Sequence, residues 1–252
     1  MNKLSNEEII RYNRQIVLQG FDFEKQEKLK SSHVLIVGLG GLGCAAAPYL
    51  ASSGIGYLTI LDFDTISLSN LQRQILYSDT KIGIPKVNVA AQKLKTINPY
   101  CNIEIINEQL NETSFSCLIS NHDAVVDCTD NIRAREQINR LCFQHRVPLI
   151  SSAAIRMEGL LSVFTWKPGE PCYRCISRLF NEYELNCLET GIIAPLVGVL
   201  GSMQALETLK VLTKFGKTLN ARLLIYDAMI MELYTVKIIQ DIYCEVCGTC
   251  NQ

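Results

Sequence analysis

The stretch VLIVGLGGLGCAAAPYLASSGIGYLTILDFD, from Val34 to Asp64, constrains the fold of this 252-residue chain more than any other feature. An apolar run predicts a buried strand, a turn follows, and a helix over Leu42–Ser53 leads into a second strand over Tyr57–Asp62. The turn fits the pattern G-x-G-x-x-G, with its glycines at Gly38, Gly40, Gly41 and Gly43. This order of elements predicts the first unit of a doubly wound, Rossmann-like α/β fold.

The glycine turn also predicts a nucleotide site. Glycines permit a tight turn and a close approach of the backbone, so that N–H groups at the start of the helix can bind a phosphate. Asp62 follows 22 positions after Gly40, at the end of the second strand, where an acid can bind ribose hydroxyls. The alternative is a glycine turn that serves only helix–strand packing, and a nicotinamide or flavin fits the turn as well as ATP does.

The rest of the chain alternates between strand and helix patterns without a linker or a repeat. We therefore expect one domain over residues 1–252, with a mostly parallel sheet, helices on both faces, an antiparallel C-terminal extension and a helical arm over about 5–30. Phe63–Ile84 and Lys167–Gly191 are predicted loops. Further predicted helices are Glu7–Gln19, Pro85–Ile97, one around Ala134–Cys142, and Pro195–Phe215; further predicted strands are Ile103–Ile106, Ala124–Cys128, Pro148–Ser151, Gly159–Trp166, Arg222–Tyr226 and Met231–Ile239.

Composition excludes several classes of function. The chain has 24 basic and 25 acidic residues, a net charge of −1 and no block of like charge, which argues against nucleic acid as a partner. The polar start lacks the apolar core of a signal peptide. The longest uncharged apolar run, Gly191–Leu206, is too short for a membrane span and predicts a buried helix. We expect a cytoplasmic protein that does not bind a membrane.

Several cations point away from redox chemistry. Arg73 follows the second strand in the segment NLQRQ, Lys86 opens the next helix, and Arg14 lies near the amino terminus. A dinucleotide pyrophosphate is usually neutralised by backbone N–H groups, whereas a triphosphate invites cationic side chains and a metal ion. The alternative for each cation is a solvated surface charge.

The segment Asp127-Cys-Thr-Asp130-Asn131 ends the predicted strand over Ala124–Cys128. Open α/β sheets bind ligands at this carboxyl edge, and a carboxylate here can hold Mg²⁺ against phosphate oxygens. Thr129, Asp130 or Asn131 can equally be the N-cap of the next helix.

Four of the eleven cysteines form two C-x-x-C pairs, Cys172/Cys175 and Cys244/Cys247. Four thiolates match a closed tetrahedral Zn²⁺ site, which is structural because it has no open coordination position. A redox C-x-x-C is the competing interpretation, and Cys247 with Cys250 can form the second pair instead. Cys187, in a predicted loop, is either a nucleophile or an ordinary half-buried cysteine. Without a secretory signal, cysteines indicate a reducing compartment rather than a disulfide scaffold.

The segments RYNRQIVLQGF, IVGLGGLG, LDFDTISLSNLQRQ, GIPKV, DCTDN, SAAIRMEG, PCYRCISRLF and CEVCG, in this order, resemble the MoeB family. These molybdopterin-synthase adenylyltransferases are related to ThiF and to ubiquitin-activating enzymes, and the resemblance extends from about Leu4 to Gly248. It implies that ATP is bound by the glycine turn, Asp62, Asn70, Arg73, Lys86, Asp130 and Asn131, with Asp130 as the Mg²⁺ ligand. It further implies a homodimer in which Arg14 enters the partner's site, and zinc on Cys172, Cys175, Cys244 and Cys247.

The activity that this resemblance implies is adenylation of the C-terminal glycine carboxylate of a small ubiquitin-fold sulfur carrier that ends in Gly-Gly (MoaD-like), with release of pyrophosphate. Cys187 matches the position of the sulfur-handling or thioester cysteine of relatives. The chain ends at the second cysteine pair without an appended rhodanese-like domain, so a separate sulfur donor is expected. The alternatives are adenylation of the thiamin-pathway carrier, as in ThiF, a nicotinamide-dependent oxidoreductase, and a non-catalytic zinc-tied scaffold.

Overall fold

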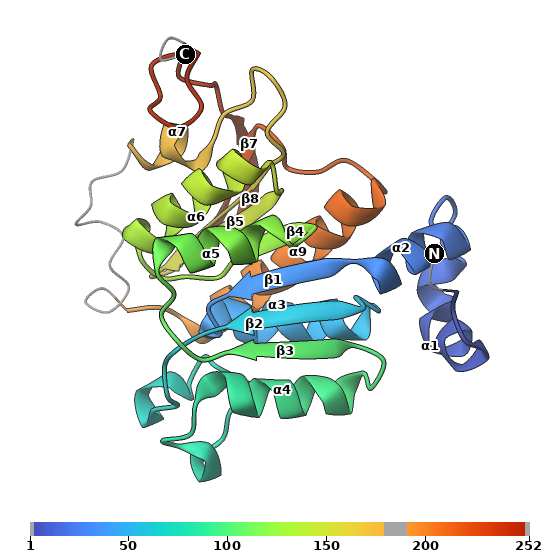
Figure 1. Cartoon of the computed structure of the whole chain (residues 1–252). Coiled ribbons are helices and arrows are strands. Elements are labelled where there is room, and N and C mark those ends of the chain that lie inside the picture. Colours follow the sequence, from blue (N-terminus) through green and yellow to red (C-terminus); the bar gives the residue numbers. More distant parts are fainter. Residues whose placement is uncertain (1–2, 179–190, 250–252) are drawn as a thin grey trace.

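A computed structural model describes residues 3–178 and 191–249 of the chain, and these residues contain one eight-stranded sheet (Figure 1). The strand order is β3-β2-β1-β4-β5-β6-β7-β8. The pairs from β3 to β5 are parallel and those from β5 to β8 are antiparallel. The strands are β1 (His33–Val37), β2 (Tyr57–Leu61), β3 (Asn102–Ile106), β4 (Ala124–Asp127), β5 (Leu149–Ile155), β6 (Glu158–Phe164), β7 (Arg222–Asp227) and β8 (Glu232–Lys237).

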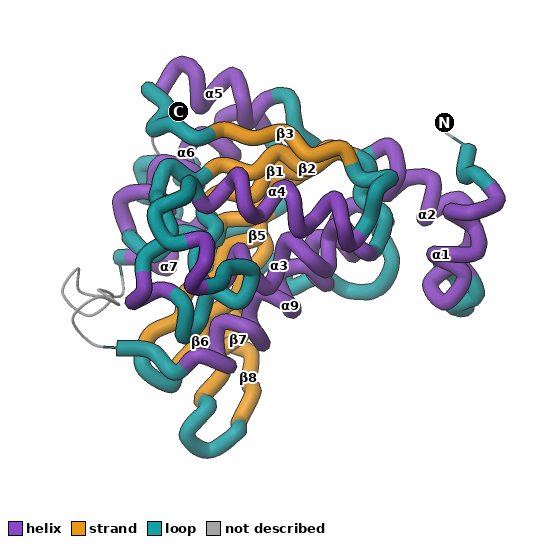
Figure 2. Tube along the Cα trace, turned by 90° about the horizontal axis from the view of Figure 1, so that it is seen from below, coloured by secondary structure: helices purple, strands orange, loops and turns teal. Residues whose placement is uncertain are grey.

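Helices cover both faces of the sheet, because β1 is apolar on both sides (Figure 2). Val34 and Ile36 face one core with α3, α4 and α9, whereas Leu35 and Val37 face a second core with α5 and α6. The helices are α1 (Asn6–Ile16), α2 (Asp22–Ser31), α3 (Gly41–Ser52), α4 (Lys86–Ile97), α5 (Glu112–Ser120), α6 (Ile132–His145), α7 (Tyr173–Ser177) and α9 (Ala194–Thr213), with 3-10 turns η1 (Leu68–Asn70) and η2 (Asp79–Lys81).

The sheet topology brings the carboxyl ends of three strands together. Val37, the last residue of β1, pairs with Leu61 of β2 on one side and with Asp127 of β4 on the other. The chain runs outward from β1 to β3 and then returns to place β4 on the opposite side of β1. Such a switch point opens a crevice at the carboxyl edge, which is where ligands bind in open α/β sheets.

The helix α9 is largely buried, as predicted for the long apolar segment. Leu196 and Leu200 join the core beneath α3, and a Cβ on Gly201 would lie only 2.4 Å from the carbonyl oxygen of Leu42. Glycine therefore permits α9 to pack closely against the helix that follows the glycine turn. In the described part of the chain, none of the helices is sufficiently long and apolar to span a membrane.

The predicted Rossmann-like sheet with its antiparallel extension is confirmed, but α5 and α7 were not predicted, and α2 was expected only as part of a helical arm over about 5–30. Only Gln26 and Leu29 of α2 are buried, so this helix has no apolar period. The helix α5 is signalled by its N-cap, since Asn111 Oδ1 accepts a hydrogen bond from Ser114 N at 2.9 Å. The helix α7 lies in the predicted loop over 167–191, and the predicted helix over 7–19 ends at Ile16.

Candidate nucleotide site and metal centre

The glycine turn joins β1 to α3, and two of its glycines are required by the fold itself. Gly38 has φ +92°, and a Cβ there would lie 2.8 Å from the carbonyl oxygen of Cys128. A Cβ on Gly43 would lie 2.1 Å from the carbonyl oxygen of Gly38. The turn therefore closes tightly against the end of β4 and against its own first residue.

The other two glycines differ from each other. A Cβ on Gly41 would lie 2.7 Å from Val197 Cγ2 of α9, whereas a Cβ on Gly40 would meet nothing closer than Gln74 Nε2 at 3.8 Å. Gly40 is the N-cap of α3 and no side chain caps this helix, so the first N–H groups of α3 have no intrahelical acceptor. The protein leaves room at Gly40, and the dipole of α3 favours an anion there.

Asp62 lies at the carboxyl end of β2 and is 8% exposed. Its Oδ2 accepts a hydrogen bond from Leu39 N at 2.6 Å, and its Oδ1 accepts one from Asp64 N at 2.9 Å. Burial raises the pKa of Asp62, and the nearby Lys86 ammonium opposes this rise. The carboxylate thus holds the glycine turn in place and still has lone pairs that can accept from ribose hydroxyls.

Lys86, the first residue of α4, is buried with 4% exposure. Its Nζ lies 2.7 Å from Asp64 Oδ2, and its backbone N–H donates to the carbonyl of Asp64. Asp64 was not predicted as a site residue, although the segment LDFD places it two positions after Asp62. Because the Asp64 side chain is 58% exposed, it can turn away when Lys86 binds a stronger anion.

Asn70 and Arg73 lie on and just after η1, in the segment that connects β2 to α4. Asn70 Oδ1 accepts a hydrogen bond from Ser67 N at 3.4 Å. Arg73 is half-buried, and its Nη1 donates to the carbonyl of Ser69 at 3.1 Å. The Arg73 guanidinium keeps further N–H donors for a phosphate.

The segment after β4 separates two roles that the sequence left open. Asn131 is the N-cap of α6, because its Oδ1 accepts from Ala134 N at 2.9 Å. Asp130 is exposed and its Oδ1 lies 3.5 Å from Asn131 Nδ2, so the Asp130 carboxylate is available to a cation. Asp127 is fully buried and accepts from Thr129 and Ser151, which fixes the turn that carries Asp130.

Arg14 does not lie with these residues. The helices α1 and α2 lie beyond the amino ends of the strands, opposite the glycine turn (Figure 1). Gln15 and Gln26 both donate to the carbonyl of Ser53 at the C-terminal end of α3, at 3.0 and 2.9 Å. The 12 residues of α3 span about 18 Å, so this length of helix separates the anchor of α1 from the turn. Arg14 is exposed.

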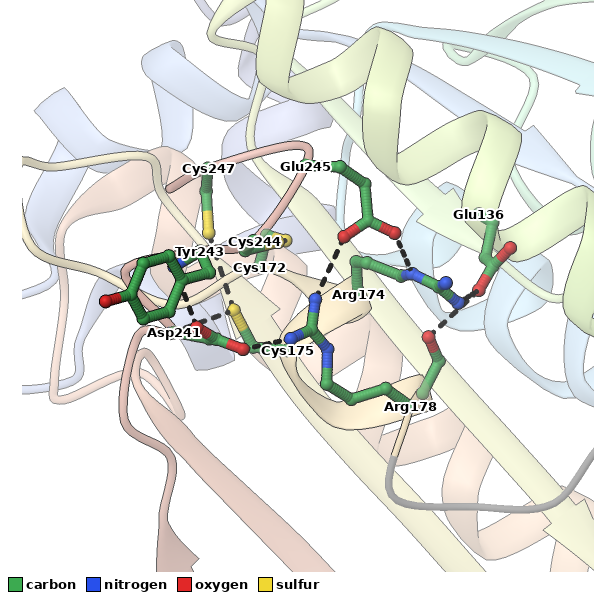
Figure 3. A network of polar contacts seen from close by, with 11 residues as sticks. Glu136, Cys172, Arg174, Cys175, Arg178, Asp241, Tyr243, Cys244, Glu245 and Cys247 are labelled. Carbon is green, nitrogen blue, oxygen red and sulfur yellow. Dashed lines mark hydrogen bonds and ion pairs between the residues drawn. The ribbon is translucent and has the colours of Figure 1, made fainter. Parts of the chain in front are cut away.

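The two C-x-x-C pairs meet in the core that α5 and α6 form with the sheet, and Figure 3 shows their side chains close together. Sγ of Cys172 lies 3.6 Å from Sγ of Cys244, Sγ of Cys175 lies 3.4 Å from Sγ of Cys247, and all four lie within 4.8 Å of one another. Tetrahedral Zn–S bonds of about 2.3 Å place sulfurs about 3.8 Å apart, whereas a disulfide needs about 2.05 Å. The buried cluster therefore fits Zn²⁺.

Arginines on and beside α7 connect this cluster to the rest of the protein (Figure 3). Arg174 donates from Nη1 to Glu136 of α6 and from Nε to Glu245, each at 2.5 Å. Arg178 binds Glu245 at 2.9 Å and also pairs with Asp241. This network was not predictable from local pattern, because its members come from three separate segments of the chain. Cys187 and Cys250 lie outside the described residues.

An open helix N-terminus, a buried acid, the cations Arg73 and Lys86 and an exposed acid follow strands that meet at one switch point, so they make a candidate nucleotide site in an α/β protein that also has a four-cysteine cluster able to hold a metal ion. The ThiF family matches residues 12–246. The chain is 56% identical to the molybdopterin-synthase adenylyltransferase of Escherichia coli (strain K12), over 98% of this chain and 100% of that one. The corresponding Salmonella typhimurium protein is 53% identical over the same shares. This chain belongs to the ThiF family.

The predicted class of enzyme, a nucleotidyltransferase, is confirmed by these full-length relatives. Among solved structures, Escherichia coli MccB with succinimide matches with a TM-score of 0.82 at 23% identity, over 98% of this chain and 75% of that one. This likeness concerns the fold and supports the Rossmann-like description. The relatives lend no support to the alternative of a nicotinamide-dependent oxidoreductase.

Proposed function

We propose that the chain is a MoeB-type enzyme that adenylates the C-terminal glycine carboxylate of a small ubiquitin-fold sulfur carrier. The observation that carries this proposal is that Gly40 follows β1, Lys86 pairs with Asp64 just after β2, and Asp130 follows β4, and these three strands are adjacent in the sheet. The full-length relatives of the chain are named molybdopterin-synthase adenylyltransferases. ATP is the nucleotide, and the products are the acyl-adenylate and pyrophosphate.

The reaction requires positioning and positive charge rather than a general base. A C-terminal carboxylate has a pKa of about 3.5 and is already ionised at pH 7. One of its oxygens attacks the α-phosphorus, the bond from this phosphorus to the bridging oxygen breaks, and pyrophosphate leaves with the electron pair. The barrier arises because two anions approach each other, and fixed cations and N–H dipoles lower it.

The residues divide this work between them. The glycine turn and the N-terminus of α3 bind phosphate oxygens, and Asp62 binds the ribose. Lys86 and Arg73 neutralise the triphosphate, and Lys86 exchanges Asp64 for phosphate when ATP binds. The further ATP contacts are Asn70 and Asn131.

Two metal ions belong to this proposal. Asp130, exposed at the end of β4, would hold the Mg²⁺ that accompanies ATP and neutralises charge on the leaving group. Cys172, Cys175, Cys244 and Cys247 would hold a structural Zn²⁺ that ties the C-terminal segment to α7.

Arg14 serves the site of a partner subunit. Its helix is anchored at the C-terminal end of α3, about 18 Å from the turn at the other end of the same helix. An extended arginine side chain cannot cover that length within its own chain. A homodimer that places α1 against the partner's carboxyl edge would complete both sites with one arginine each.

The carrier is the MoaD-like small subunit of molybdopterin synthase, because the full-length relatives carry that enzyme's name. Adenylation of the thiamin-pathway carrier, as in ThiF, is the second candidate, since the same nucleotide chemistry serves both carriers. Sulfur comes from a separate protein, and the reaction takes place in the cytoplasm. The domain that performs it spans residues 1–252.

The test is ATP–pyrophosphate exchange with candidate Gly-Gly-terminated carriers supplied one at a time. We expect exchange with the MoaD-like carrier, loss of exchange in Asp130→Ala with an unchanged fold, and normal exchange in Glu24→Ala, which removes an exposed carboxylate at the opposite end of the molecule. Near-normal exchange in Asp130→Ala would refute the magnesium assignment. Mixing Arg14→Ala with Asp130→Ala should restore activity through hybrid dimers; no recovery in mixtures shown to exchange subunits would refute action in trans.

A further inference from the structure

Two glutamine side chains fasten the helix α1 to the C-terminal end of α3. Gln15 Nε2 donates to Gln26 Oε1 at 2.8 Å and to the carbonyl of Ser53 at 3.0 Å. Gln26 Nε2 donates to the same carbonyl at 2.9 Å, and the Gln26 side chain is fully buried. Ser53 is the C-cap of α3, so this amide cluster of Gln15, Gln26 and the Ser53 carbonyl joins α1, α2 and α3.

The amide cluster has a fixed geometry. Both N–H groups of the Gln15 amide and both lone pairs of the Ser53 carbonyl are used, which sets the orientation of each amide. Gly54 follows with φ +92°, and a Cβ there would lie 2.5 Å from Gln26 Nε2, so glycine makes room for this contact. The helix α1 therefore cannot rotate about its own axis without breaking these bonds.

This fixed rotation determines the direction of Arg14, which precedes Gln15 in the chain. Tyr12 is buried, and its hydroxyl accepts a hydrogen bond from Asn98 Nδ2 at 2.8 Å, so Tyr12 and Gln15 hold the same side of α1 against its own chain. Successive residues lie about 100° apart around a helix axis. Because Gln15 faces α3, Arg14 points away from it and is exposed.

The two arginines of α1 differ in what they bind. Arg11 Nη1 donates to the carbonyl of Ile97 at 3.1 Å, and its guanidinium lies 5.7 Å from the centre of the Tyr100 ring. Among the residues that the structure describes, Arg14 makes no side-chain hydrogen bond or ion pair. Arg11 is therefore committed to its own chain, and Arg14 is the arginine of α1 that can serve another subunit.

We propose that Gln15 is a positioning residue whose bonds to Gln26 and to the Ser53 carbonyl fix the rotation of α1 and so aim Arg14 into the site of the partner subunit. This inference rests on the proposed function, namely on a homodimer with Arg14 acting in trans. Gln15 lies at the end of α3 opposite the glycine turn and does not touch the nucleotide of its own chain. Its effect belongs to the reaction of the other chain, because a cation stabilises developing charge only when it is held at the right place.

The test uses hybrid dimers of an Arg14→Ala chain and an Asp130→Ala chain, isolated through two different affinity tags. Only one site of the hybrid is complete: the site of the Arg14→Ala chain, which receives Arg14 from the Asp130→Ala chain. Gln15→Met removes the amide while largely keeping the volume, and it is added to one chain or to the other. ATP–pyrophosphate exchange with the MoaD-like carrier is measured for both placements and for the parent hybrid.

The expected result depends on the placement. Gln15→Met in the Asp130→Ala chain, next to the working arginine, should lower exchange about tenfold or more, because a small misplacement of a catalytic group costs this much. The same substitution in the Arg14→Ala chain should leave exchange within about twofold of the parent hybrid. Gln26→Met, which breaks the cluster from α2, should show the same asymmetry. The control Gln92→Met, on the exposed side of α4, should change exchange in neither placement.

The outcomes separate this inference from the proposed function. A parent hybrid without activity would overturn the action of Arg14 in trans, and the role of Gln15 with it. An active parent hybrid that loses activity equally in both placements would overturn the role of Gln15 alone, since a loss that ignores placement reflects stability or dimer contacts. An active parent hybrid that is unaffected by Gln15→Met in either placement would overturn this role as well.

Discussion

Alanine substitutions at Gly40 and Gly43 should separate ligand binding from folding within one turn of the chain. At Gly43 the new Cβ would lie 2.1 Å from the oxygen and 3.0 Å from the carbonyl carbon of Gly38. These are backbone atoms at the junction of β1 and α3, so neither side can yield without moving a buried element. Overpacking of this kind costs about 1–3 kcal/mol and occasionally more, and we expect about 3 kcal/mol for Gly43→Ala.

At Gly40, by contrast, an added Cβ has room, so the substitution should affect ligand binding more than folding. The nearest atom to a new Cβ is Gln74 Nε2 at 3.8 Å, an ordinary contact distance, and φ at Gly40 is −72°. Alanine is a poorer N-cap than glycine but restricts the unfolded chain, and each of these effects is about 1 kcal/mol or less. The folded state of Gly40→Ala should therefore stay within about 1 kcal/mol of the wild type, whereas its methyl group occupies the space proposed for phosphate.

Thermal unfolding followed by circular dichroism and MgATP calorimetry measure the two effects independently. For a protein of this size, 1 kcal/mol shifts the midpoint by about 2–4 °C, so Gly43→Ala should lose about 6–12 °C. Gly40→Ala should keep its midpoint within about 4 °C and weaken MgATP binding about tenfold or more. Wild-type affinity in Gly40→Ala would refute the assignment of phosphate to this position, and a wild-type midpoint in Gly43→Ala would refute the steric reasoning.

Three further predictions concern the metal centre and the N-terminal arm. Cys172→Ser should lose bound zinc by elemental analysis and unfold at a lower temperature, whereas Cys117→Ser, an exposed cysteine outside the cluster, should retain zinc. Arg174→Gln should lower the midpoint by about 2–4 °C, because its partly exposed ion pairs contribute about 1 kcal/mol; an unchanged midpoint would contradict this. Burial acts to raise the pKa of Glu8, but hydrogen bonds from Lys30 and Ser5 outweigh it and lower the pKa below its ordinary 4.5. The ionised Glu8 therefore stabilises the fold above this pH, so the destabilisation by Glu8→Gln should be complete at pH 7 and shrink as the pH falls below about 4.5 in urea titrations; a constant difference would contradict it.

Much of the fold was predictable because its signals are local. The parallel strands β1, β2 and β4 are short apolar runs next to glycine or acidic turns, and such runs indicate buried strands whatever surrounds them. The helix α2 was not assigned by its pattern, because its few buried positions depend on packing at the end of α3. The short helix α7 begins directly after Cys172 and contains Cys175, and its five residues are too few to show an apolar period.

Within the candidate site, too, some features follow from local spacing and others only from tertiary packing. Asp62 and the glycines could be assigned from spacing, since a strand, a turn and a helix set their relative positions directly. The ion pair of Lys86 with Asp64 could not, because the two residues are 22 positions apart and meet only where α4 returns to the end of β2. The N-cap of α6 remained open between three neighbouring residues until the backbone geometry assigned it to Asn131.

The sequence alone determined the order of the eight strands and of the helices α1, α3, α4, α6 and α9, the glycine turn and the four cysteines, because each depends on residue types at fixed local spacing. Only the tertiary structure decided that the cysteine pairs, separated by residues 176–243, close into one cluster. It also decided that Gln74 faces Gly40 and that Arg14 lies at the far end of α3. The physical reason is that these relations arise from the packing of distant segments against the sheet, and no local pattern encodes such contacts.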